Sequence, residues 1–185
     1  MKTKISLYAR SFVSLLRIAF IKIFNFNRFF SAYAQDFSCS TEICVKRGGK
    51  IFLDKHIHTK KDVEFSAMGG TLNIGEGCFF NSGCKIVSMD GITIGSKSAF
   101  GPNVLVYDHD HDTLRTAETE EKYNTAPVII GRRVWIGANT VILRGTVIGD
   151  NCVIGAGSVI KGEYPPNSIV IQKRSEEIIT KSRGE

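Results

Sequence analysis

A chain of 185 residues is long enough for one domain with a substantial hydrophobic core. Its net charge of +6 could favour nucleic acid, but residues 1–35 supply the whole excess of base over acid through Lys2, Lys4, Arg10, Arg17, Lys22 and Arg28. The remainder of the chain is neutral, which argues against a nucleic-acid partner.

Residues 1–35 form a separate N-terminal arm that is rich in Leu, Ile and Phe. Basic residues interrupt the apolar run, so it fits neither a transmembrane helix nor a secretory signal. The spacing predicts an amphipathic helix, with one apolar face formed by Leu16, Phe20, Ile23 and Phe24. Two roles remain open for this helix. It contacts an anionic membrane through residues 1–30, or it packs on the solenoid or on a partner subunit.

From residue 48 onward the sequence carries a period of six. The period is clearest in isoleucines that stand six residues apart, at Ile130, Ile136, Ile142, Ile148, Ile154 and Ile160. Positions six apart do not share a helix face, but they do share a position in a parallel β-solenoid in which each hexad makes one flat side. Weaker hexads begin at Ile51, so we expect the solenoid to cover residues 48–171.

A short interruption at residues 88–91 shifts the period by two residues, and two longer segments depart from it. Residues 107–127 are polar and non-periodic, which predicts a long loop leaving a corner of the solenoid, and loops of this length in compact domains are usually functional. Residues 172–185 are charged and predict a mobile C-terminal tail.

Five cysteines are an odd number, and none of them forms a C-x-x-C pair. Three of them, Cys78, Cys84 and Cys152, occupy the small position of a hexad, where a thiol acts as an apolar filler. We interpret the cysteines as reduced and the compartment as cytoplasmic.

The predicted loop opens with a cluster of titratable residues, from Asp108 to Asp112. A histidine that neighbouring carboxylates orient suits general-base removal of a hydroxyl proton. His109 and His111 point to the same side if the segment is extended, so composition does not separate them. His56 and His58 form a second His-x-His pair, but a catalytic zinc site needs three protein ligands, so neither pair predicts a metal centre.

Several motifs together resemble one family, the hexapeptide-repeat acyltransferases, and within it the galactoside, maltose and polysaccharide O-acetyltransferases. The motifs are Gly101-Pro102-Asn103-Val104, Val134-Trp135-Ile136-Gly137-Ala138, Ile154-Gly155-Ala156-Gly157-Ser158-Val159-Ile160-Lys161 and Pro165-Pro166-Asn167-Ser168. The resemblance implies an all-β fold, a left-handed parallel β-helix with an N-terminal amphipathic helix, assembled as a homotrimer with the active site between neighbouring solenoids.

The resemblance also implies roles for individual residues. His111 takes the place of the catalytic histidine, because its distance to Trp135 fits the family better than that of His109, and Asn81 matches the acceptor-site asparagine. Trp135 would flank the pantetheine arm, and the Ala138 N–H would receive the thioester oxyanion. Ala156 and Lys161 would line the coenzyme A groove.

The function implied is acetyl transfer from acetyl-CoA to a sugar hydroxyl during the biosynthesis of surface polysaccharide or lipopolysaccharide. The enzyme would act in the cytoplasm, and contact through residues 1–30 would place it on the inner face of the membrane. Two alternatives remain open: a zinc enzyme of the γ-type carbonic anhydrase kind, and a non-catalytic solenoid scaffold. The sequence leaves the acceptor sugar and its hydroxyl undefined.

Overall fold

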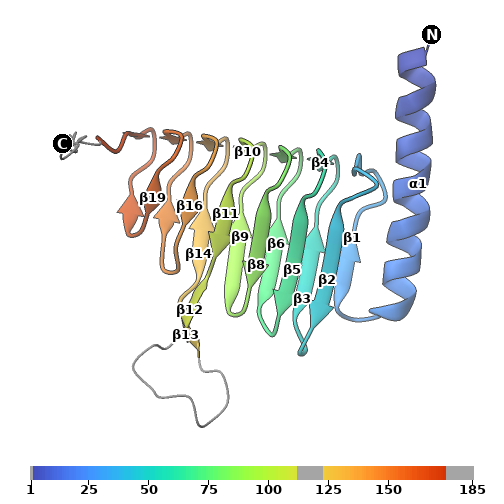
Figure 1. The fold of residues 1–185 in the computed structure, drawn as a ribbon. Coiled ribbons are helices and arrows are strands. Elements are labelled where there is room, and N and C mark those ends of the chain that lie inside the picture. Colours follow the sequence, from blue (N-terminus) through green and yellow to red (C-terminus); the bar gives the residue numbers. More distant parts are fainter. Residues whose placement is uncertain (1, 112–122, 174–185) are drawn as a thin grey trace, which may run out of the picture.

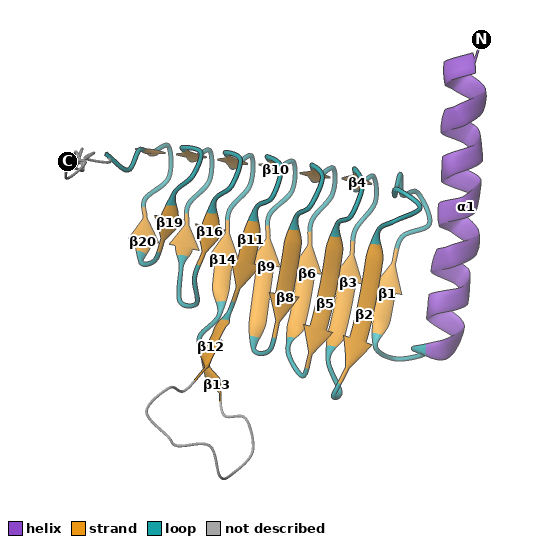
Figure 2. Cartoon of the chain, in the orientation of Figure 1, coloured by secondary structure: helices purple, strands orange, loops and turns teal. Residues whose placement is uncertain are grey.

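The computed structural model describes residues 2–111 and 123–173. One N-terminal helix, α1 (Lys2–Phe24), stands beside a parallel β-solenoid whose coils stack in a row (Figures 1 and 2). Apart from a short hairpin, the strands form three parallel sheets, here called A, B and C, and each complete coil between the first and the last contributes one strand to each sheet. The predicted parallel β-helix with an N-terminal helix is confirmed.

The three sheets are continuous along the solenoid. Sheet A contains β1 (Phe29–Ser31), β3 (Lys50–Leu53), β6 (Thr71–Ile74), β9 (Gly91–Ile94), β14 (Val128–Ile130), β17 (Val147–Ile148) and β20 (Glu163–Tyr164). Sheet B contains β4 (His58–Thr59), β7 (Phe79–Phe80), β10 (Ala99–Phe100), β15 (Trp135–Ile136), β18 (Val153–Ile154) and β21 (Ile169–Val170). Sheet C contains β2 (Glu42–Lys46), β5 (Glu64–Met68), β8 (Lys85–Ser88), β11 (Leu105–Tyr107), β16 (Val141–Ile142) and β19 (Val159–Ile160).

The core follows the period of six. The six isoleucines from Ile130 to Ile160 are at most 1% exposed, and the Phe80 and Phe100 rings stack inside the solenoid with centroids 4.5 Å apart. The glycines at the corners allow neighbouring coils to approach closely. A Cβ atom on Gly101 would lie 2.6 Å from the Ala138 backbone nitrogen, so a side chain there would force the coils apart.

The solenoid begins earlier than the sequence predicted. The boundary at residue 48 is wrong, because β1 pairs in parallel with β3, and Phe37 of the same first coil is buried. Residues 29–47 therefore form a coil of their own. The sequence did not indicate this coil, since Phe29 and Phe37 stand eight residues apart and break the period.

Helix α1 closes the open end of this first coil. Ile18 is fully buried, and the Ser14 hydroxyl donates to the Phe37 carbonyl over 3.2 Å. The Arg17 guanidinium donates to three carbonyls that have no further coil to pair with, those of Ser38, Cys39 and Thr41. The helix thus packs on the solenoid, one of its two predicted roles. No helix among the described residues is long and apolar enough to span a membrane.

The last coil is closed by a side chain. Gln172 accepts from the Val159 N–H over 2.9 Å and donates to the Val159 carbonyl over 2.6 Å, so it replaces the strand that would come next. The predicted tail continues into residues 174–185, which lie outside the described residues.

The buried cysteines give a test of the core. Burial raises the pKa of Cys78 and Cys84 to about 11, so both stay protonated at neutral pH and the reactive thiolate is suppressed. Cys39, in contrast, is exposed. At about pH 8 we expect a thiol reagent to modify native protein at Cys39, and to reach Cys78 and Cys84 only after unfolding in urea. Peptide mass spectrometry reports the modified sites, and rapid labelling of Cys84 in native protein would contradict the burial.

Candidate active site

A groove of about 430 Å³ runs along the edge where sheet B turns into sheet C. Four residues predicted for the site, Asn81, Trp135, Ala138 and Ala156, line this groove together. Asn81 follows β7, Trp135 lies on β15, and Ala138 and Ala156 occupy the turns after β15 and β18. They come from three different coils, which stack so that these residues form one row.

The groove contains the exposed aromatic ring of Trp135 and the backbone N–H of Ala138. Trp135 points outward and is 59% exposed, which is unusual for the largest aromatic side chain. Within the described part of the chain, the Ala138 N–H donates no hydrogen bond, although its neighbours Gly137 and Asn139 donate to the Ile154 and Pro102 carbonyls. A fixed backbone N–H of this kind can stabilise negative charge on an acyl oxygen.

The histidine cluster lies on a hairpin rather than in an irregular loop. β12 (His109–His111) pairs antiparallel with β13 (Tyr123–Thr125), and residues 112–122 between them lie outside the described residues. Arg144, in the next coil, donates from Nε to the Asp110 carboxylate over 2.6 Å. This ion pair ties the hairpin to the solenoid.

The base of the hairpin is organised by the buried carboxylate of Asp108. It accepts from the Ser88 hydroxyl over 2.9 Å and from the N–H groups of Met89 and Asp90 over 2.8 and 2.9 Å. The His109 Nδ1 lies 3.1 Å from the same carboxylate. Asp108 therefore joins the β8–β9 turn to the hairpin and orients the His109 ring.

The two histidines of the hairpin have different surroundings. The side chain of His109 is only 14% exposed, between the edges of the Tyr107 and Tyr123 rings. His111 is exposed, and its ring contacts Tyr123 at a centroid distance of 4.9 Å. The sequence had not separated these environments, which the pairing of β12 with β13 creates.

Within one chain the hairpin and the groove are apart. The hairpin follows β11 at the edge where sheet C turns into sheet A, and it projects from the side of the solenoid opposite sheet B (Figure 1). The groove lies at the other edge of sheet C. Lys161, predicted to line the groove, follows β19 and so stands at the hairpin edge.

In the second histidine pair, His58 contacts residues of the neighbouring coils. His58 Nδ1 lies 2.5 Å from the Asp36 carboxylate, and the His58 ring stacks on Phe79. Residues 2–111 and 123–173 contain no group of three or more His, Cys, Asp or Glu side chains that could hold a metal ion. The zinc alternative thus finds no support in these residues.

Sequence reasoning missed Asp108 as the centre of the hairpin base. A signal was present, because the period of six is interrupted at Ser88, Met89 and Asp90, the three residues that donate to it. Arg144 carried no comparable signal. Its role depends on the position of Asp110, which only the folded hairpin defines.

The sequence of this chain is similar to those of several known proteins. The profile of the bacterial transferase hexapeptide family (six repeats) matches residues 127–162. WbbJ of Escherichia coli K12, assigned to lipopolysaccharide biosynthesis as an O-acetyl transferase, is 28% identical over 136 residues, 68% of this chain and 69% of WbbJ. The galactoside O-acetyltransferase of the same organism is 34% identical over 105 residues, 57% of this chain and 52% of that enzyme.

Solved structures share the fold. A hexapeptide-repeat-containing acetyltransferase from Vibrio cholerae, solved with acetyl coenzyme A, superposes with a TM-score of 0.51 at 24% identity, covering 89% of this chain and 81% of that one. The fold and the repeat define a hexapeptide-repeat solenoid. Residues 127–162 carry the repeat of the bacterial transferase hexapeptide family, in agreement with the resemblance of the motifs, and the chain is similar to O-acetyltransferases over 105 to 136 residues. The match spans about half of the galactoside enzyme and about two thirds of WbbJ.

Proposed function

We propose that this protein is an acetyl-CoA-dependent O-acetyltransferase that acts on a sugar hydroxyl in the biosynthesis of surface polysaccharide or lipopolysaccharide. The groove carries the proposal, because it brings an exposed Trp135, an available Ala138 N–H and Asn81 into one row. The relatives support the same chemistry, since WbbJ and the galactoside enzyme are both named as O-acetyl transferases.

In the proposed mechanism, His111 removes the proton from the acceptor hydroxyl while the hydroxyl oxygen attacks the thioester carbonyl directly. The Ala138 N–H stabilises the oxygen of the tetrahedral intermediate. The C–S bond then breaks, and the proton held by His111 passes to the departing thiolate. Asn81 positions the acceptor or the histidine. Trp135 and Ala156 hold the pantetheine arm, and no covalent bond to the enzyme forms.

The proposed assembly is a homotrimer with a shared active site. Strand β11 separates Pro102 at the groove from Asp108 at the hairpin, so the two lie at opposite edges of sheet C. His111 is exposed and lies on β12, in the hairpin that projects from the side of the solenoid opposite sheet B (Figure 1). A neighbouring chain placed beside the hairpin edge would receive His111 and Lys161 next to its own groove, which explains why the two halves of the site lie on different edges.

We also propose peripheral contact with a membrane through residues 1–30. The support is the composition of α1, whose outward side chains are apolar and whose charged residues are all basic. This contact would bring the enzyme to acceptors that are carried on lipid.

Labelled acetyl-CoA tests the proposed chemistry. The purified protein should transfer label to a member of a panel of glycan acceptors and release free coenzyme A in equal amount. Ala156→Trp should abolish transfer by filling the groove, while Val159→Trp, which places the same side chain at an exposed position of sheet C, serves as the control. Absence of both transfer and acetyl-CoA hydrolysis across the panel would leave the scaffold alternative standing.

A further inference from the structure

Helix α1 exposes an apolar surface on the side that faces away from the solenoid. Ser14 and Ile18 mark the buried side of the helix. At 3.6 residues per turn, the opposite side carries three large apolar residues whose exposed fractions range from 54% to 73%: Leu16, Phe20 and Ile23. We call these three residues the outward face. A cap of the solenoid end needs only the inward side of the helix.

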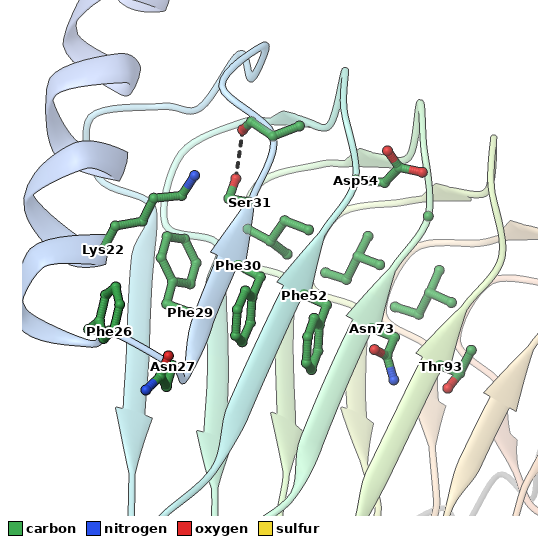
Figure 3. A pocket seen from close by; sticks show the side chains of 15 residues that line it. Lys22, Phe26, Asn27, Phe29, Phe30, Ser31, Phe52, Asp54, Asn73 and Thr93 are labelled. Atoms are coloured by element: carbon green, nitrogen blue, oxygen red, sulfur yellow. Dashed lines mark hydrogen bonds between the residues drawn. The ribbon is translucent and has the colours of Figure 1, made fainter.

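The apolar surface continues beyond the end of the helix. Phe26, 82% exposed, follows α1 and borders an open groove of about 800 Å³ between the helix and the outer side of sheet A (Figure 3). The Phe30 and Phe52 rings form the floor of this groove and stack with centroids 4.8 Å apart. The outward face and the groove together make an apolar surface that monomeric proteins in water rarely expose.

All charged residues of the N-terminal segment have the same sign. Residues 1–35 contain six bases and no acid. Arg17 is engaged by carbonyls of the first coil, and Lys22 lies 3.9 Å from the centre of the Tyr33 ring, at the edge of the groove. An apolar face on a segment whose only charged residues are basic is complementary to a surface that is apolar inside and negatively charged outside.

The position of the helix distinguishes a bilayer from a second copy of the chain. α1 stands across the N-terminal end of the solenoid, so its outward face is directed along the solenoid axis and away from all coils (Figure 1). Subunits of a side-by-side trimer cover the flanks of one another and leave the ends free. Three such ends would lie in one plane, which suits a flat surface.

We infer that the protein docks end-on to an anionic lipid bilayer through the outward face of α1, with the helix still packed on the first coil. The inference rests on the proposed membrane contact and adds its surface and its orientation. The solenoid axis then runs along the bilayer normal. The helix does not need to detach, because its inward and outward sides serve different partners.

This orientation determines how far the candidate active site lies from the bilayer surface. Asp36 in the first coil, His58, Phe79, Ala99 and Trp135 follow one another in register across sheet B. Four steps of about 4.8 Å place Trp135 roughly 19 Å above the first coil, with the thickness of α1 added below. The acceptor hydroxyl therefore belongs to a glycan that extends from the lipid surface, and not to the sugar next to the lipid.

Sedimentation with vesicles tests the docking surface. Full-length protein should bind vesicles of phosphatidylcholine mixed with phosphatidylglycerol, bind pure phosphatidylcholine more weakly, and lose binding as salt is added. The double variant Phe20→Ser, Ile23→Ser should bind at least about tenfold more weakly, because it removes two large apolar side chains from the face that enters the bilayer. The matched control is Ile169→Ser, Ile171→Ser, which removes side chains that are 72% and 73% exposed at the other end and should bind like wild type.

The single tryptophan tests the orientation. Brominated lipids should leave Trp135 fluorescence unchanged when the protein is bound end-on. In the Trp135→Phe background, a tryptophan introduced by Phe20→Trp should be quenched by the same lipids. Quenching of Trp135 itself would mean that a flank of the solenoid contacts the bilayer, and it would overturn the end-on arrangement.

Two further outcomes would overturn the docking. One is equal vesicle binding by the Phe20→Ser, Ile23→Ser variant and wild type. The other is a change in molecular mass of this variant by light scattering without lipid, which would assign the outward face to another copy of the chain. Release of coenzyme A, measured without vesicles, is an independent readout. If the wild-type protein released no coenzyme A, the proposed acetyl transfer would be rejected, and the docking result would not be affected.

Discussion

His111→Ala should lower kcat for acetyl transfer by about 10²–10⁴-fold, the usual contribution of a general base. The affinity for coenzyme A should stay close to wild type, because Trp135 and Ala156 form the groove at the other edge of sheet C. Steady-state kinetics give kcat, and calorimetry with coenzyme A gives the affinity. Size-exclusion chromatography should show an unchanged assembly.

His109→Ala is the matched control for this variant. His109 lies between Asp108 and two tyrosine rings at the base of the hairpin, where it supports the backbone. We expect its loss to lower kcat by less than about tenfold. If His109→Ala were the inactive variant and His111→Ala the active one, the base would be the histidine that Asp108 orients, and the assignment would move two residues toward the N-terminus.

Asp108→Ala should lower the free energy of unfolding by about 3 kcal/mol, because a buried hydroxyl and two partly buried N–H groups would lose their acceptor. The same change should lower kcat, since the hairpin that carries His111 loses its attachment to the β8–β9 turn. Coenzyme A affinity should not change. Urea unfolding and kinetics measure the two effects separately.

Two controls show whether burial is the cause. Asp108→Asn keeps the volume and one carbonyl oxygen, so it should restore part of the stability. Asp150→Ala removes a partly exposed carboxylate that accepts two hydrogen bonds from the Arg132 side chain, and its effect on unfolding should be much smaller. Equal losses for Asp108→Ala and Asp150→Ala would show that the hairpin base does not depend on Asp108.

The regular part of the fold could be predicted because its cause is local in the sequence. An aliphatic residue at every sixth position, followed by a glycine that permits the close approach at a corner, specifies each side of each coil. The first coil was missed because Phe29 and Phe37 do not keep this spacing. That coil is instead specified by the strands above it and by the helix below it.

The candidate groove could be predicted from motifs, since Trp135, Ala138 and Ala156 keep fixed places within their hexads. Stacking of the coils then brings these residues into one row along the groove. The attachment of the hairpin could not be predicted in the same way. Asp108 meets partners 18 to 20 residues earlier in the chain, and Arg144 meets Asp110 from 34 residues away.

Composition and spacing alone show that the chain is a solenoid of six-residue sides, and that its N-terminal arm is amphipathic, basic and too interrupted by charge to span a membrane. Only the folded chain shows that α1 caps the first coil with one side and exposes Phe20 on the other, and that groove and hairpin lie at opposite edges of sheet C. Each of these results depends on which coil lies beside which, and coils become neighbours only when backbone hydrogen bonds form between residues that are distant in the sequence.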